Sequence, residues 1–192
     1  MEVKKWYRVL TIVLCLGMTA CVSDIWTGAN IIYDRHTLYR KITDFQLGSS
    51  ANRALYIDQR FKCASCSIEV AVFHRDILMT GHVPTQELRR EATARIKAIP
   101  GKRRFYDELA VFNGVSDPIL DSWITAKIRS EMVTDATIDP NQFKIVTSDR
   151  VVYLMGDVIP EQAEKVISFA RQWNEVKRVV TLFQYYHLSN KA

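Results

Sequence analysis

The feature that most constrains the fold of this 192-residue chain is an internal repeat. The stretch Ile68–Gly81, IEVAVFHRDILMTG, aligns without a gap with Phe143–Gly156, FKIVTSDRVVYLMG, at an offset of 75 residues (from 68 to 143). The same offset places one Lys-Arg pair, at 102–103, on another at 177–178. Two copies are too few for a solenoid, which stacks three or more repeats. The repeat therefore predicts two related small domains.

Each copy has the same predicted order of elements: helix, strand, strand, helix, strand. The first helix is expected at Ser50–Phe61 in copy one and at Ile119–Val133 in copy two. Two strands joined by a polar turn follow, with HRD at 74–76 and SDR at 148–150 between them. One face of a three-stranded sheet is then buried beneath two helices, which is a two-layer arrangement. The predicted fold class is α+β, with two tandem αββαβ domains.

A second helix and a closing strand complete each copy. Glycine and proline mark the passage from the second strand into this helix, at Gly81 and Pro84 in copy one and at Gly156 and Pro160 in copy two. Apolar side chains then recur at helical spacing, which predicts a buried stripe. The stripe residues are Leu88, Ala92, Ile96 and Ile99 in copy one, and Ala163, Val166, Ile167, Ala170 and Trp173 in copy two. The closing strands are expected in RFYDELAVF and RVVTLFQYY.

The N-terminus, MEVKKWYRVLTIVLCLGMTAC, is typical of a secretory signal peptide. Lys4, Lys5 and Arg8 form a positively charged start. The apolar run Val9–Met18 that follows is too short to span a bilayer, which needs about 20 apolar residues. Residues 1–20 are therefore excluded from the predicted fold.

The small residues that end at Cys21 resemble a bacterial lipobox. This resemblance implies cleavage after Ala20, a thioether-linked lipid on Cys21 and acylation of the new amino group. Several acyl chains anchor a protein stably where one chain is marginal. Met18 stands where the lipobox usually has Leu, and Val22, in place of Asp, favours the outer membrane with the protein facing the periplasm. The alternative is an ordinary signal peptide that leaves Cys21 free.

Cys63 and Cys66 form a CASC motif just before a predicted strand, SIEVAVF. A thioredoxin-like redox pair needs a thiolate stabilised by the N-terminus of a following helix, which a strand does not supply. A zinc site needs two further ligands at suitable spacing, whereas the four histidines, at positions 36, 74, 82 and 187, are scattered. We favour a local disulfide, which an oxidising periplasm permits, or two reduced thiols in a turn. The redox and metal alternatives stay open.

Charge and motif content exclude several classes of function. The formal net charge is +5, and without the charged residues of the first eight positions it is +3, from 23 basic and 20 acidic residues. Because no dense Lys/Arg stripe is interleaved with aromatics, no nucleic-acid partner is expected. No nucleophile–His–acid set or glycine-rich phosphate loop is present, and Asp107 and Glu108 point to opposite faces of a strand. We therefore expect no enzyme, no cofactor and no metal.

The repeat unit resembles the BON domain of bacterial envelope proteins. The resemblance rests on an apolar strand, a G-x-V segment, a short polar helix and a closing motif that reads GKRRFYDEL from Gly101 and VKRVVTL from Val176. With the lipobox and the segment YDRHTLYRKITD (Tyr33–Asp44) upstream, the chain resembles dual-BON outer-membrane lipoproteins over almost all of its mature length. Each domain is then a three-stranded mixed sheet with two helices on one face. The expected divisions are a signal peptide (1–20), a lipidated N-terminus and linker (21–47), and two BON-like domains (48–114 and 115–192).

This resemblance implies a phospholipid-associated protein that supports outer-membrane integrity, with lipid contact by the first helix of the second domain. Trp123 and Lys127 lie one turn apart in DSWITAKIRSEMV, a pair suited to the headgroup region of an anionic membrane. Ile119 and Leu120 just upstream, and Arg129 nearby, complete the candidate lipid-binding site. The alternative is that Trp123 packs against the first domain or the linker.

The expected function is therefore that of a lipid-anchored periplasmic protein that binds an anionic phospholipid membrane. The first domain is expected to be a spacer or a partner-binding domain. Two attachments to the same membrane act together and raise the effective affinity. The rival hypothesis is an adaptor that docks on the outer-membrane assembly machinery or on another lipoprotein. A thiol oxidoreductase acting through Cys63 and Cys66 is the weaker alternative.

Overall fold

In the computed structural model, the compact unit Arg40–Ala192 holds both copies of the repeat. The structure describes residues 35–57 and 59–186. The first copy consists of α2 (Arg35–Tyr56), β1 (Ser67–Phe73), β2 (Asp76–Val83), α3 (Gln86–Lys97), β3 (Arg104–Asp107) and β4 (Ala110–Val111). The second copy consists of α4 (Pro118–Thr134), the short 3-10 helix η2 (Pro140–Gln142), β5 (Phe143–Ser148), β6 (Val151–Val158), α5 (Pro160–Arg171) and β7 (Arg178–Tyr185).

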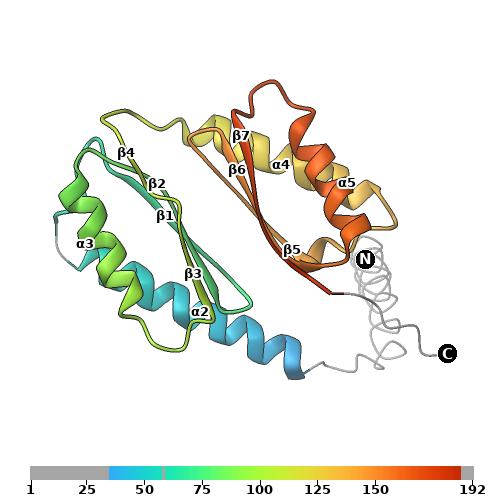
Figure 1. Cartoon of the computed structure of the whole chain (residues 1–192), viewed down its shortest axis with the longest axis horizontal. Coiled ribbons are helices and arrows are strands. Elements are labelled where there is room, and N and C mark those ends of the chain that lie inside the picture. Colours follow the sequence, from blue (N-terminus) through green and yellow to red (C-terminus); the bar gives the residue numbers. More distant parts are fainter. Residues whose placement is uncertain (1–34, 58, 187–192) are drawn as a thin grey trace, which may run out of the picture. The chain divides into compact units, whose positions relative to one another are not determined.

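Each copy is a mixed sheet with two helices on one face, as the sequence predicts (Figure 1). In the first sheet β2 is central, antiparallel to β1 and parallel to both β3 and β4. The second sheet has the order β5-β6-β7, with β6 antiparallel to β5 and parallel to β7. The αββαβ order and the α+β class are thus confirmed. The closing strand of the first copy is divided into β3 and β4, because Leu109, between them, turns into the core (2% exposed).

The first helix of the first copy starts earlier than the sequence predicts. The expected helix was Ser50–Phe61, whereas α2 runs from Arg35 to Tyr56. Its buried residues, Leu47, Ala51 and Leu55, lie in its second half, whereas the apolar side chains of Tyr39, Ile42 and Phe45 before them are exposed. Most of the segment predicted as linker, Tyr33–Asp44, therefore belongs to α2.

Gly81 and Gly156 lie inside β2 and β6 rather than at the strand ends where they were expected. A Cβ atom on Gly81 would lie 1.9 Å from the carbonyl oxygen of Ser67, and the φ angle of this glycine is +97°. A Cβ atom on Gly156 would lie 2.7 Å from the carbonyl oxygen of Gln142. Glycine is needed at both positions because the backbone at the start of β1 and just before β5 approaches too closely for a side chain.

Both faces of each sheet are buried. One face packs against the helices of its own copy. The opposite faces share a third cluster of buried side chains, with Ala71 and Leu78 from the first sheet and Val146, Tyr153 and Met155 from the second. The 75-residue offset maps Ala71 onto Val146 and Leu78 onto Tyr153, so equivalent positions of the two copies meet in this cluster.

All three clusters of buried side chains lie within residues 47–183. The unlipidated chain 22–192 therefore keeps every residue of these clusters and is suited to solution experiments.

Candidate membrane-binding face

The orientation of α4 is fixed by its cap and by its buried stripe. The Asp117 side chain accepts a hydrogen bond from the backbone N–H of Leu120 (3.0 Å), and Pro118 occupies the first turn, where a missing N–H costs nothing. The helix therefore starts one residue before the predicted Ile119. Its buried residues recur at helical spacing and are Asp121, Ile124, Ile128 and Met132.

The side of α4 opposite this stripe carries large apolar side chains that the fold leaves uncovered. Ile119 is 82% exposed, Trp123 is 40% exposed and Val133 is 71% exposed. At about 100° per residue, these three and the exposed Ala126 form one surface, which we call the outer ridge of α4. Leu120, by contrast, is half-buried and packs against the core of the second copy.

Lys127 and Arg129 flank the outer ridge on opposite sides of the helix. The Lys127 ammonium lies 5.3 Å from the ring centroid of Trp123 and 5.4 Å from that of Trp173. The two indoles meet edge to face, with centroids 5.7 Å apart. The structure thus brings Trp123 and Lys127 together as the sequence suggested, and it supplies a ring partner, Trp173, from the same copy.

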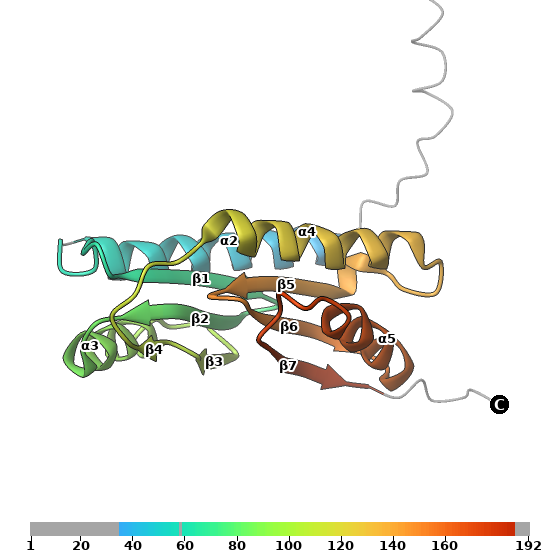
Figure 2. The same cartoon turned by 90° about the horizontal axis from the view of Figure 1, so that it is seen from above.

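The flank that carries Arg129 borders a cavity of about 410 Å³ between α4 and β5, an edge strand that lies alongside the helix in Figure 2. The lining residues include Ser122, Thr125 and Arg129 from the helix, Lys144 and Thr147 from the strand, and Glu69 from the first copy. Burial raises the pKa of Glu69, and the charge of Lys144 lowers it by less. Because Asp121 also lines this cavity, two carboxylates balance its two cations.

An aspartate on the first helix of each copy, half-buried in the first copy and buried in the second, holds the turn between the first two strands. Asp121 accepts hydrogen bonds from both backbone N–H groups of the turn residues 149–150 (2.8 Å each). Asp44 does the same for residues 74–75, at 2.8 and 2.7 Å. All four turn residues have positive φ angles, which non-glycine residues rarely adopt. Burial raises the pKa of Asp121, and the two N–H donors oppose this effect.

Two histidine–aspartate pairs that were not predicted from the sequence join the copies. His82 Nδ1 lies 2.7 Å from Asp149 Oδ2, and His74 Nδ1 lies 2.7 Å from Asp157 Oδ2. The 75-residue offset maps position 74 onto 149 and position 82 onto 157, so the two pairs occupy equivalent places. The second ring nitrogen of His82 lies 3.2 Å from the carbonyl oxygen of Gly114. The 75-residue offset could have indicated these pairs, because both positions are histidine in the first copy and aspartate in the second.

Cys63 and Cys66 form a disulfide in the loop before β1, with their Cα atoms 5.0 Å apart. Among residues 35–57 and 59–186, no group of three or more His, Cys, Asp or Glu side chains is arranged to hold a metal ion. No helix in this described part of the chain has the length and apolar character needed to cross a membrane. The predicted lipidation site, Cys21, lies outside the described residues.

Both copies of the repeat match one known protein family. Residues 48–112 and residues 120–185 each match the BON domain. These two segments make up well over half of the chain. The chain therefore belongs to the BON-domain family and carries two BON domains in tandem, which we now call the first and the second domain.

The chain is also similar to individual proteins. It is 28% identical over 182 residues to the outer membrane lipoprotein DolP of Haemophilus influenzae, covering 90% of this chain and 94% of that protein. It is 27% identical over 120 residues to a 21 kDa hemolysin of Actinobacillus pleuropneumoniae, covering 62% of each. These similarities identify a dual-BON lipoprotein of the DolP-like type.

Among solved structures, the chain matches CdsD, a structural protein of the type III secretion system of Chlamydia trachomatis. The identity is 10% and the TM-score is 0.31, with 75% of this chain and 94% of that chain covered. A score this low carries no argument about fold or function.

Proposed function

We propose that this protein is anchored through a lipid on Cys21, faces the periplasm, and binds anionic phospholipid through the outer ridge of α4. Similarity to the outer membrane lipoprotein DolP supports association with the outer membrane. The names of these relatives, an outer membrane lipoprotein and a hemolysin, describe no catalysed reaction, and we propose a binding role without catalysis. The observation that carries the proposal is the outer ridge itself, on which Ile119, Trp123 and Val133 stay exposed.

The energetics favour a weak and reversible contact that supplements an anchor. Full burial of an aliphatic side chain such as that of Ile119 or Val133 contributes about 1.5–3 kcal/mol, and partial immersion contributes less. A cation close to an anionic surface adds about 1 kcal/mol, and Lys127 and Arg129 stand on the two sides of the ridge. The half-exposed indole of Trp123 suits the headgroup region, where one end is apolar and the other is wet. Tethering by a lipid would make this contact effectively intramolecular.

Vesicle co-sedimentation tests the proposal. The chain 22–192 is expected to bind vesicles that contain phosphatidylglycerol more strongly than vesicles of phosphatidylcholine, and binding should weaken as salt rises. Trp123→Ala should lower the affinity for the anionic vesicles about tenfold, a change equivalent to about 1.4 kcal/mol. Because Trp123 also packs on Trp173, circular dichroism must show that the variant stays folded. Unchanged vesicle binding by the folded variant would contradict the proposal and favour docking on a protein.

We propose a structural role for the disulfide between Cys63 and Cys66. The residue after Cys66 begins β1, so no helix N-terminus is present to stabilise a thiolate. In the chain 22–192 these are the only two cysteines, and labelling should find no accessible thiol until a reductant is added. Rapid turnover of the disulfide with a small dithiol would favour the oxidoreductase alternative instead.

A further inference from the structure

The outer edge of β1 faces α2, and no strand among the described residues is hydrogen-bonded to it. In this part of the chain β1 pairs with β2 alone, and alternate residues of a strand direct their N–H and C=O groups to the same edge. The Ile68 carbonyl accepts a hydrogen bond from the Tyr56 hydroxyl (2.8 Å), and the His74 N–H donates to Asp44. Both partners belong to α2. The even-numbered residues of β1 therefore direct their backbone groups away from β2, toward α2.

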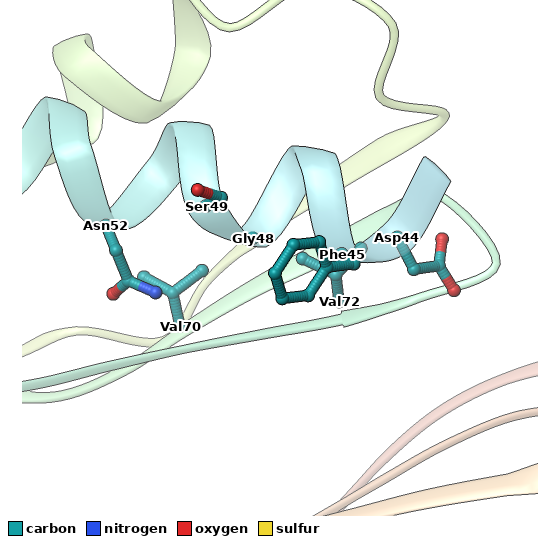
Figure 3. A pocket seen from close by; sticks show the side chains of 7 residues that line it. All are labelled: Asp44, Phe45, Gly48, Ser49, Asn52, Val70 and Val72. Carbon is teal, nitrogen blue, oxygen red and sulfur yellow. The ribbon is translucent and has the colours of Figure 1, made fainter. Parts of the chain in front are cut away.

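Two of the even-numbered residues of β1, Val70 and Val72, face an open groove. Tyr56 and Asp44 contact the two ends of the edge, and Asn52 and Gly48 occupy the two helical turns between them. Figure 3 shows Asn52 and Gly48 above β1, where they line a groove of about 440 Å³ together with Val70 and Val72. Within the described residues, the edge-facing N–H and C=O groups of residues 70 and 72 have no hydrogen-bond partner.

The corresponding edge of the second domain is occupied by side chains. In the first domain, Gly48 and Asn52 follow Asp44 by four and eight residues. In the second domain, Thr125 and Arg129 follow Asp121 at the same spacing. The Thr125 hydroxyl donates to Thr147 Oγ1 (2.8 Å), and Arg129 and Lys144 line the cavity beside β5. Charged side chains at a sheet edge discourage the addition of another strand. The first groove has no Lys or Arg in its lining, and its one charged lining residue, Asp44, lies at the end of the β1 edge.

We propose that the groove between α2 and β1 binds an extended segment of a partner polypeptide, which adds a strand to the first sheet. Another backbone supplies the donors and acceptors that complement residues 70 and 72, whereas a lipid does not. Phe45, which is 77% exposed, stands at the rim of the groove and offers an apolar surface to alternate side chains of the segment (Figure 3).

Charge complementarity defines the segment further. The carboxylate that lines the groove, Asp44, is already bonded to two backbone N–H groups. The exposed cations nearest in sequence are Lys41, one turn before Phe45, and Arg53, next to Asn52. The segment that fits is therefore apolar at alternate positions and acidic at its ends. This site is separate from the outer ridge of α4, so a variant in the groove should leave vesicle binding unchanged.

A synthetic peptide tests the proposal. The probe is Glu-Glu-Val-Thr-Val-Thr-Val-Glu-Glu with both ends blocked, and its control carries the same side chains with every second amide N-methylated. Fluorescence anisotropy with the chain 22–192 should show saturable binding of the probe and at least tenfold weaker binding of the control. Hydrogen exchange should slow at the amides of Val70 and Val72, and stay unchanged at Ala71, which points toward β2. Equal binding of the two peptides, or no binding of the probe at 1 mM, would overturn the proposal.

A variant that copies the second domain supplies the matched test. Gly48→Thr with Asn52→Arg should lower probe affinity at least tenfold, whereas Ser50→Arg, on another side of α2, should not. The backbone at residue 48 accepts a Cβ atom, because this atom would lie 3.6 Å from Val72 Cγ2, an ordinary contact. Thermal unfolding checks that both variants fold. Unchanged affinity in the double variant would refute the site, and concentration-dependent protection of residues 70 and 72 without peptide would assign the edge to a second copy of this chain.

Discussion

Replacing Asp149 with asparagine tests the ion pairs that join the two domains. The imidazole of His82 is 1% exposed and meets acceptors at both nitrogens, the Asp149 carboxylate at 2.7 Å and the Gly114 carbonyl at 3.2 Å. Asparagine keeps the size of aspartate and tolerates the φ angle of +52° found here, so the exchange removes the charge and one of the two oxygens, which face His82 and accept from Ser116 Oγ. A hydrogen bond to a charged group contributes about 1.5–3 kcal/mol, against about 1 kcal/mol for a neutral one. Asp149→Asn should therefore destabilise the protein by about 1–2 kcal/mol.

Urea denaturation and calorimetry of the chain 22–192 measure this loss. For a unit of this size, about 2–4 °C in Tm corresponds to each kcal/mol, so Tm should fall by about 2–8 °C. Asp139→Asn is the matched control, because Asp139 is exposed and its side chain bonds only to the nearby Asn141, and it should change stability by less than about 0.5 kcal/mol. A double-mutant cycle with His82→Gln should give a coupling of about 1–2 kcal/mol. Coupling near zero, with equal effects of the two asparagine variants, would refute the reasoning.

Three further predictions concern single positions. Burial raises the pKa of Asp157, but hydrogen bonds from a histidine and an arginine lower this pKa by more. The ionised carboxylate therefore stabilises the fold above pH ~4, and this stabilisation is lost as pH falls through the pKa of Asp157 in the folded protein. Asp157→Asn should therefore lower Tm at pH 7, and its effect should shrink as pH falls below about 4. Gly81→Ala should cost at least about 4 kcal/mol or prevent folding, whereas Gly101→Ala, with a φ of +83° and open space around it, should cost about 1–2 kcal/mol in urea denaturation. Val70→Pro removes an edge-facing N–H and should be tolerated, whereas Ala71→Pro breaks the hydrogen-bond ladder to β2 and should cost on the order of 1–3 kcal/mol. Thermal melts of the two variants measure this difference, and equal melting temperatures would contradict it.

The repeat made most of the fold predictable. It set the order of elements in both domains, and the buried positions on α3 and α5 followed from helical spacing. The start of α2 was not predictable from this pattern, because no side chain among residues 39–46 is buried, and Asp44 bonds instead to the turn between β1 and β2. The positive φ angles at 74–75 and 149–150 also escaped prediction, since their stabilising carboxylates lie about 30 residues earlier in the chain.

Contacts between the domains were the part that local patterns missed. Periodicity assigns a residue to a face, but it does not show that the open faces of two sheets cover each other. His82 and His74 looked scattered in the sequence because each has its partner in the other domain. On α4, by contrast, Trp123 and Lys127 were found from their one-turn spacing, whereas Trp173 packs beside them through tertiary structure alone.

The proposed lipid contact is tested most directly by two matched isoleucine variants. Ile119, on the outer ridge of α4, is 82% exposed, and Ile57, just after α2, is 76% exposed, so serine at either position removes a similar apolar surface with little effect on the core. The measurement is the Kd of the chain 22–192 for phosphatidylglycerol vesicles. We predict that Ile119→Ser weakens binding about fivefold to tenfold, equivalent to about 1–1.4 kcal/mol, while Ile57→Ser leaves it unchanged. Equal affinities for Ile119→Ser, Ile57→Ser and the unmodified chain would contradict lipid binding by the outer ridge of α4.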